Sequence, residues 1–362
     1  MDTFAFIIHP IDPKRDVSRK FPLLGRVLNE RQIDFFSTFF PPIYISEIEG
    51  ITSVSTGKQV MGWFIAAPYT PRRMLELPER TVYRKIVQVG RMAERLGARI
   101  LGLGAFTSVV GDAGVTIARA LDVPVTTGDS YTISIAVQSI REAARLMDIP
   151  LRGATAAVVG ATGSIGRVCA ELLAEDVQRL YLVARSQEKL EGLREQLAGP
   201  GRSELVVSTK LDALAQAQLI LTVTSAIHDV IHPEHLQPGS VVCDVARPRD
   251  VSVMVAAARN DILVIDGGMV DVPGPVDFHF NFGFPAGKSY ACMAETIALA
   301  LEGRFEDYTL GKMITRARVD EITAIAEKHG FRLSGFRSFE REVTSQQIEA
   351  VRRNARNRAR RA

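Results

Sequence analysis

Residues 154–174 read ATAAVVGATGSIGRVCAELLA, and this stretch decides the fold of the middle of the chain. Its first six residues form a short apolar run typical of a buried strand, and residues 167–174 have the pattern of an amphipathic helix. Between them, Gly160 permits a tight turn, Gly163 lets backbone N–H groups approach a pyrophosphate, and Gly166 lets helix and strand pack closely. This order predicts nucleotide binding, although a glycine turn that only packs would look the same.

The surrounding sequence predicts an α/β fold with a central Rossmann-like parallel sheet, over residues 150–270, and helices on both faces. Short Val, Ile and Leu runs alternate with helical segments, as a parallel sheet covered on both faces requires. We expect these further strands at 179–184, 204–208, 219–224, 240–245 and 261–266. An N-terminal α/β domain is expected over 1–145. A loop with helices near 288–303 and 312–329 should fill 271–334, and a basic C-terminal extension should fill 335–362.

Length and composition are those of an ordinary globular protein. The chain has 362 residues, 46% hydrophobic and 23% charged, which is enough for two or three domains. The sequence contains no run of about 18 uncharged apolar residues, so we expect no membrane-spanning helix. The N-terminus lacks a basic region and a cleavage site, and Thr3–His9 is expected to be a strand. Three widely spaced cysteines offer no disulfide framework and no metal site, so we expect a cytoplasmic protein.

The net charge of +3 is concentrated at the C-terminus. Residues 351–362 carry six arginines and no acid, which leaves the other 350 residues at −3. A solvated terminal helix explains such a tail, and so does an electrostatic patch for an acidic partner, a membrane surface or a nucleic acid. We favour the solvated helix.

The expected cofactor site lies at the carboxyl ends of the predicted strands. A carboxylate that would bind both ribose hydroxyls of NAD is absent from the end of the second strand, which carries Arg185 and Ser186 instead. An arginine can pair with a 2′-phosphate, so the sequence favours NADP(H) over NAD. Asp244, Arg247 and Asp266 flank later strand ends. We expect them to line the nicotinamide pocket without taking part in the chemistry. The predicted cofactor-binding residues are Gly160, Thr162, Gly163, Ser164, Ile165, Gly166, Arg185, Ser186, Thr224, Ser225, Gly267 and Gly268.

One cysteine lies where chemistry is plausible. Cys292 is in the first turn of the helix predicted from SYACMAETIALALEG, residues 289–303. A helix N-terminus lowers a thiol pKa, and Lys288 is one turn away. A thiolate there could attack a thioester and form an enzyme-bound thioester. Hydride transfer from NADPH would then release an aldehyde. From the residues alone, packing of a small-residue helix is the stronger interpretation. Cys169 and Cys243 are expected to be buried.

A second motif resembles a different enzyme class. Tyr308 and Lys312 form the YxxxK spacing of short-chain dehydrogenases, which would indicate a ketone or alcohol substrate. Those enzymes place a serine about one helix upstream, where this chain has Glu295. We therefore expect the pair to be structural.

Seven stretches resemble the long-chain acyl-[acyl-carrier-protein] reductases, which are NADPH-dependent, aldehyde-forming enzymes of lipid metabolism that feed alkane biosynthesis in cyanobacteria. The ordered set covers about residues 70–333, and the likeness is loose before 68 and ends near 335. The stretches are LGLGAFTSVV (101–110), VPVTTGDSYT (123–132), AAVVGATGSIGRVC (156–169), YLVARSQEKLEGL (181–193), ILVIDGGMVD (262–271), YACMAETIALALEG (290–303) and AIAEKHGF (324–331).

The resemblance implies a catalytic role for Cys292, because the cysteine of the family's ACxAE segment carries the acyl group. It implies NADPH at the GATGSIG turn, and it places the acyl and carrier side in the N-terminal domain. Asp129 stands where the family's TTGN-type segment has asparagine, and its role is left open. The proton donor is open as well, with Tyr290 and Ser225 as weak candidates.

The implied partner is acyl carrier protein, which is acidic, with acyl-CoA as the alternative. Residues 72–99 hold eight basic residues against three acids and could form the docking surface, or simply a solvated face. The aromatic loop 278–284 is a candidate wall for the acyl chain. A downstream aldehyde-consuming enzyme and peripheral membrane contact are conceivable further partners, and nucleic acid is not expected. A shikimate- or amino-acid-type dehydrogenase and a non-catalytic NADP sensor stay open as alternative functions.

Overall fold

The computed structural model describes residues 1–226 and 228–360, and it divides into two compact units. Unit 1 comprises Met1–Tyr131 with Val270–Arg332, and unit 2 comprises Thr132–Met269 with Leu333–Ala362. Helix α8 (Asp129–Leu146) crosses the first of these changes. The domain boundaries expected at 145–150 and 334 therefore differ from the points where the units change, and they stay predictions.

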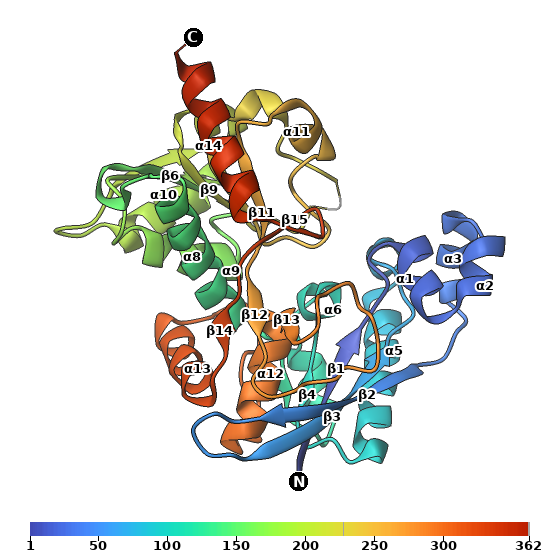
Figure 1. Cartoon of the computed structure of the whole chain (residues 1–362). Coiled ribbons are helices and arrows are strands. Elements are labelled where there is room, and N and C mark those ends of the chain that lie inside the picture. The colour runs from blue at the N-terminus through green and yellow to red at the C-terminus, as the bar shows by residue number, and fades with distance from the viewer. Residues whose placement is uncertain (227, 361–362) are drawn as a thin grey trace. The chain divides into compact units, whose positions relative to one another are not determined.

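Unit 2 is built on a six-stranded parallel sheet (Figure 1). Its order is β11-β10-β9-β6-β7-β8, the doubly wound Rossmann arrangement, in which the strand order reverses between β6 and β9. The fold class predicted from the sequence is thereby confirmed. The strands are β6 (Thr155–Val159), β7 (Arg179–Val183), β8 (Glu204–Ser208), β9 (Leu219–Thr222), β10 (Val241–Asp244) and β11 (Leu263–Asp266).

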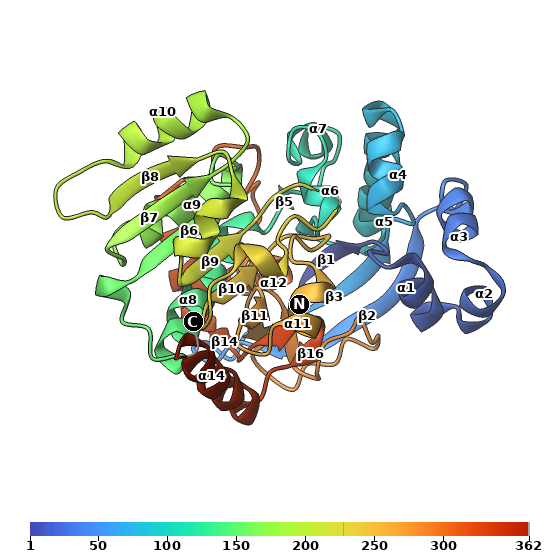
Figure 2. The ribbon, with the colours of Figure 1, turned by 90° about the horizontal axis from the view of Figure 1, so that it is seen from above.

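Helices and short turns connect these strands. Figure 2 shows α9 and α10 following β6 and β7 in turn. The helices of unit 2 after α8 are α9 (Ser164–Leu173), α10 (Gln187–Leu197), α11 (Val253–Ala258) and α14 (Ser345–Ala359), with the 3-10 turns η1 (Leu151–Gly153), η2 (Leu211–Gln216) and η3 (Pro233–His235). A small hairpin of β15 (Arg337–Ser338) and β16 (Arg341–Glu342) precedes α14.

Unit 1 contains a five-stranded sheet in the order β2-β3-β1-β4-β5. All its neighbours are parallel except the β2–β3 hairpin. Along β1, Ala5 and Ile7 face the core that includes α5, whereas Phe6 lies beside Gly102 and α12 on the other face. The strands are β1 (Asp2–Ile8), β2 (Ile43–Thr52), β3 (Gln59–Ala66), β4 (Leu101–Gly102) and β5 (Val125–Thr126).

Helix α5 (Glu79–Leu96) shows why its sequence folds as it does. Val82, Ile86, Val89 and Ala93 repeat at helical spacing and are buried, and Gly97 ends the helix in the left-handed conformation. The other helices of unit 1 are α1 (Pro13–Lys20), α2 (Pro22–Val27), α3 (Glu30–Ser37), α4 (Pro71–Glu76), α6 (Phe106–Val109), α7 (Val115–Arg119), α12 (Ala291–Glu302) and α13 (Arg316–His329).

Two helices begin later than the sequence suggested. Residues 288–290 form strand β13 (Lys288–Tyr290), and α12 starts only at Ala291. Likewise α13 starts at Arg316, because the Thr315 hydroxyl caps it by accepting the N–H of Arg318. Gly330 ends α13 in the left-handed conformation, as predicted. The short strands β12 (Met269–Asp271) and β14 (Arg332–Leu333) carry the chain between the units.

Candidate functional site

The glycine turn of unit 2 has the geometry of a phosphate-binding loop. Gly160 has φ +82°, and a Cβ built on it would lie 2.4 Å from the carbonyl oxygen of Val223. A Cβ on Gly166 would lie 2.2 Å from the carbonyl oxygen of Gly160. Larger residues at these positions would force the strand, turn and helix apart. Both positions therefore leave no room for a side chain, so that the strand, the turn and the helix can pack closely.

The start of α9 is open to an anion. Gly163 is the N-cap residue and offers no side chain to the first N–H groups of the helix. Thr162, Ser164 and Ile165 are partly exposed beside it. Uncapped N–H groups and the helix dipole favour negative charge at this position. The turn thus fits the pyrophosphate of a dinucleotide.

Arg185 and Ser186 follow β7 and have different tasks. The Ser186 hydroxyl caps α10 by accepting the N–H of Lys189 at 3.4 Å. Arg185 is exposed, and no acid within the described ranges forms an ion pair with it. Its guanidinium is therefore available to a ligand, whereas Ser186 is occupied by the helix.

The loops after β9 and β11 each contain one residue engaged in structural contacts and one that is more open. Thr224 donates its N–H to the buried carboxylate of Asp250 at 2.8 Å, and its hydroxyl donates to the same group. Ser225 next to it is exposed. A Cβ on Gly268 would meet Ile135 and Ser139 at 2.2 and 2.5 Å, so Gly268 is required for packing against α8. Gly267 faces more open space.

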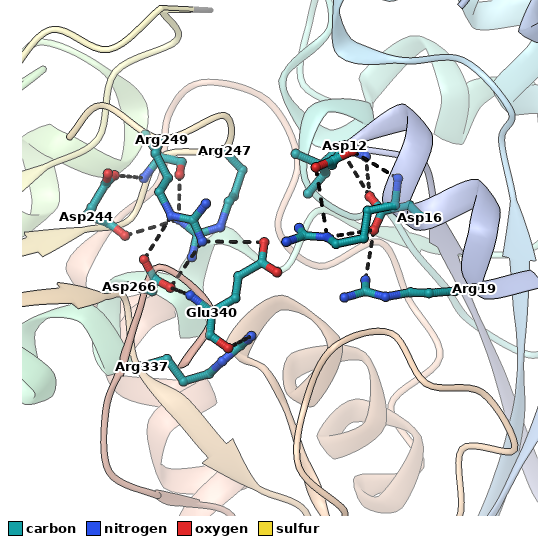
Figure 3. Close-up of polar contacts among 12 residues, drawn as sticks. Asp12, Asp16, Arg19, Asp244, Arg247, Arg249, Asp266, Arg337 and Glu340 are labelled. Atoms are coloured by element: carbon teal, nitrogen blue, oxygen red, sulfur yellow. Dashed lines mark hydrogen bonds and ion pairs between the residues drawn. The ribbon is translucent and has the colours of Figure 1, made fainter. Parts of the chain in front are cut away.

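An ion-pair network closes the ends of β10 and β11 (Figure 3). Arg249 binds both carboxylate oxygens of Asp266 at 3.0 and 3.2 Å, and it lies 3.5 Å from Glu340 on the terminal hairpin. Burial favours a higher pKa for Asp266, but Arg247 and Arg249 outweigh burial and hold this pKa below its usual value. Asp244 accepts the N–H of Val251, and burial raises its pKa to about 7. These charged groups hold the loops after β10 and β11 in place. The sequence had suggested no chemical role for them.

Cys292 lies in unit 1, at the second position of α12. Gly128 packs directly against it: a Cβ on Gly128 would lie 2.4 Å from both Cα and Cβ of Cys292. Gly128 has φ +78°, a conformation that favours glycine. The segment Thr126–Tyr131 and the start of α12 therefore meet at backbone distance. Lys288 lies in β13 instead of the helix and pairs with Asp271 at 3.1 Å.

The thiol is not activated as the sequence suggested. Burial and the nearby Asp129 carboxyl raise the pKa of Cys292 to about 12, and the backbone N–H groups of Met293 and Ala105 only partly oppose them. The expectation of a lowered pKa at the helix N-terminus is therefore wrong for this state, because desolvation outweighs the helix end. Ala105 itself has φ +47°, which is unusual for a residue with a Cβ.

Two buried acids, Asp129 and Glu295, lie beside the cysteine, and sequence reasoning assigned a role to neither of them. Burial, followed by repulsion from Glu295, raises the pKa of Asp129 to about 7. Glu295 is fully buried and accepts the Thr126 hydroxyl at 2.5 Å, the Thr309 hydroxyl at 2.8 Å and the Tyr131 N–H at 2.8 Å. Glu295 is the last residue of the ACxAE segment, but nothing in the sequence revealed its hydrogen-bond partners.

An aromatic row ends at the helix that carries Cys292. Phe278 and Phe282 both pack against Phe64, Phe282 stacks on Phe284, and the Phe284 ring lies 4.3 Å from that of Tyr290. Tyr290 is the N-cap residue of α12. The aromatic rings of loop 278–284, which we expected to line the acyl chain, thus form a row that ends at Tyr290, two residues before Cys292.

The remaining candidates have structural surroundings. Cys169 and Cys243 are fully buried, as expected. Tyr308 is buried and donates its hydroxyl to Glu321 at 2.9 Å. In the C-terminal tail, Arg352 and Arg356 both pair with Asp148 at 3.0 Å. The tail is helical to Ala359, and residues 361–362 lie outside the described part of the chain.

Of the basic segment 72–99, part is already neutralised. Arg73, Arg91 and Arg99 form ion pairs with nearby acids. Within 1–226 and 228–360, no acid forms an ion pair with the other four arginines of the segment, which are Arg72, Arg80, Arg84 and Arg95. None of the helices described is both long and apolar enough to cross a bilayer, and the same residues contain no cluster of His, Cys, Asp or Glu suited to a metal.

Part of unit 2 matches a family of dehydrogenases. The family described as shikimate / quinate 5-dehydrogenase matches residues 141–266. The crystal structure of L-tryptophan dehydrogenase from Nostoc punctiforme is similar with a TM-score of 0.41 and 14% identity, over 100% of this chain and 89% of that chain. The family match and the glycine turn together indicate an oxidoreductase with a nicotinamide cofactor.

Two curated proteins are similar over most of the chain. Aminotransferase PigE from a Serratia species is 35% identical over 84% of this chain, which spans only 36% of PigE. The long-chain acyl-[acyl-carrier-protein] reductase from Synechococcus elongatus is 30% identical over 91% of this chain and 98% of that protein. The chain therefore belongs to the same family as the long-chain acyl-[acyl-carrier-protein] reductase of Synechococcus elongatus.

Proposed function

We propose that this protein reduces a long-chain acyl thioester to the fatty aldehyde with NADPH, and that Cys292 carries the acyl group between the two half-reactions. The setting of Cys292 carries the proposal. Cys292 is half-buried, its sulfur interacts with the N–H groups of Met293 and Ala105, and an acid of near-neutral pKa lies beside it. A cysteine that only filled space would need none of these features.

We propose that Asp129 is the base that accepts the proton of the Cys292 thiol. With a pKa of about 12, Cys292 is almost entirely protonated at neutral pH, so a base must take its proton as it attacks. The Asp129 carboxyl, with a pKa of about 7, is about half ionised at neutral pH and can then accept a proton. Glu295 is a weaker candidate, because its two oxygens already accept three hydrogen bonds.

In the first half-reaction, the Cys292 sulfur bonds to the acyl carbon and the carrier sulfur leaves. The proton that Asp129 removed from Cys292 passes to the departing carrier thiolate. The N–H groups of Met293 and Ala105 stabilise negative charge on the Cys292 sulfur. The product is an acyl thioester on Cys292 and a free carrier thiol.

The second half-reaction needs a hydride at the acyl carbon, and NADPH would supply it when bound. The carbon–sulfur bond then breaks, the aldehyde leaves, and the Cys292 sulfur regains a proton, so that one NADPH and one proton are consumed per turnover. Gly160, Gly163 and Gly166 would hold the pyrophosphate, and Arg185 the 2′-phosphate that distinguishes NADPH from NADH. The aromatic row from Phe64 to Tyr290 would line the acyl chain.

The carrier is proposed to be acyl carrier protein, as in the Synechococcus relative's name. The four arginines of segment 72–99 that lack an acidic partner suit an acidic protein. A docking surface of this kind predicts that salt raises the KM for the carrier substrate.

Turnover with a defined substrate tests the function. Palmitoyl-acyl carrier protein and NADPH should yield hexadecanal, one per NADPH oxidised, and Cys292→Ser should abolish the product. The dehydrogenase match to residues 141–266 supports one rival, a dehydrogenase that acts without covalent catalysis. That rival would keep its turnover in Cys292→Ser, and a non-catalytic sensor would form no aldehyde at all.

A further inference from the structure

The N-terminal lobe, residues 13–44, carries a concentration of exposed apolar side chains. It comprises α1, α2, α3 and the segment leading into β2, and Figure 1 shows its three helices grouped together. Nine of the sixteen large apolar side chains that are exposed in the described residues belong to this lobe. They are Phe21, Leu23, Leu24, Val27, Phe35, Phe36, Phe39, Phe40 and Tyr44. Such a concentration of exposed apolar side chains in one lobe is typical of an interaction surface.

The lobe is also positively charged. Residues 13–40 contain six basic and three acidic residues. Two of the acids are engaged within the protein, since Asp16 pairs with Arg19 at 2.8 Å and Asp34 pairs with Arg73 at 3.3 Å. No acid in the described ranges pairs with Lys14, Arg26 or Arg31, all of which are exposed.

The basic segment 72–99 adjoins the lobe. Lys85 donates from α5 to the carbonyl oxygen of Phe40 at 2.6 Å, and the Arg73 guanidinium lies 6.0 Å from the centre of the Phe35 ring. Basic side chains of α4 and α5 therefore lie directly beside the exposed phenylalanines of the lobe. Leu75 on α4, two residues after Arg73, is a further exposed apolar side chain.

We infer that the N-terminal lobe binds the surface of an anionic lipid bilayer. Short helices with exposed Phe, Leu and Val beside unpaired cations can insert apolar tips into the interface while the cations contact lipid head groups. A protein partner is a poorer match, because binding hot spots favour Trp, Tyr and Arg, whereas Leu and Val are under-represented there. The lobe exposes two leucines and one valine beside its five phenylalanines, and only one tyrosine.

Vesicle co-sedimentation of the full chain tests this inference. Wild type should bind vesicles of 3:1 phosphatidylcholine and phosphatidylglycerol, and it should bind pure phosphatidylcholine much more weakly. The triple variant Leu23→Ser, Val27→Ser, Phe39→Ser removes side chains that are 74%, 78% and 71% exposed. Its affinity should fall on the order of 100-fold. Arg26→Gln and Arg31→Gln should each weaken binding to the anionic vesicles about fivefold.

The matched control is Val253→Ser with Met254→Ser, which removes side chains that are 68% and 57% exposed in unit 2. It should bind vesicles as wild type does, and all variants should keep the wild-type unfolding temperature. The inference is overturned if wild type ignores anionic vesicles or if the triple variant still binds them. It is also overturned if the triple substitution abolishes a dimer seen by size exclusion, because the lobe would then be a contact between two copies.

Discussion

Gly128→Ala tests the close approach between residues 126–131 and the start of α12. Alanine at φ +78° costs about 1–2 kcal/mol for its left-handed conformation. Its Cβ would also lie 2.4 Å from Cα and Cβ of Cys292. Because backbone atoms cannot swing aside as a side chain can, overpacking should add about 1–3 kcal/mol. We expect a total loss of about 2–5 kcal/mol in the free energy of unfolding, together with a displaced Cys292.

Gly287→Ala is the matched control, since Gly287 has φ +76° and its Cβ would meet no atom within 4 Å. It should lose only the conformational cost of about 1–2 kcal/mol. Urea unfolding gives both free energies, and the rate at which a palmitoyl thioester acylates each protein gives the effect on Cys292. Equal stability and equal acylation rates in the two variants would refute the claim that Gly128 holds the cysteine in place.

Three further substitutions address the cofactor and the buried acids. Arg185→Ala should weaken NADPH binding by about 10-fold or more and leave NADH binding unchanged in fluorescence titrations, and an unaltered NADPH/NADH ratio would exclude Arg185 as the 2′-phosphate ligand. Asp129→Asn should slow acylation of Cys292 about 100-fold or more if the carboxylate accepts the thiol proton, whereas faster acylation would mean that Asp129 only suppresses the thiolate. The pKa of Asp129 is raised from 3.8 to about 7, so its contribution to stability is full below pH 3.8 and is lost as pH rises through 7. Asp129→Asn should therefore remove up to about 4 kcal/mol of that pH-dependent loss in unfolding experiments between pH 4 and 8. Glu295→Leu should cost about 2–4 kcal/mol in the free energy of unfolding, because the Thr126 and Thr309 hydroxyls and the Tyr131 N–H lose their acceptor, and a loss below 1 kcal/mol would contradict the hydrogen bonds described.

The Rossmann sheet was predictable because each of its strands has a local sequence pattern. Each is a continuous apolar run bounded by turns, and the structure places every one within two residues of its predicted limits. The glycine turn was equally legible, since its three positions are set by contacts within seven residues and the neighbouring strand.

The sheet of unit 1 was much less accessible to sequence reasoning. Strands β4 and β5 are two residues long, and α12, which packs against β1, β3 and β4, comes nearly 200 residues further along the chain. The environment of Cys292 depends on the same long-range closure, because Glu295 and Tyr131 meet across 164 residues of sequence. A thiol pKa that burial determines cannot be deduced from the helix end alone.

Intact-protein mass spectrometry tests the central claim most directly. Wild type incubated with a palmitoyl thioester in the absence of NADPH should gain one palmitoyl group, and Cys292→Ala should gain none. Adding NADPH should then remove the adduct and release one equivalent of hexadecanal. A protein that forms hexadecanal without ever showing an adduct, or an adduct that persists in Cys292→Ala, would contradict the covalent route through Cys292.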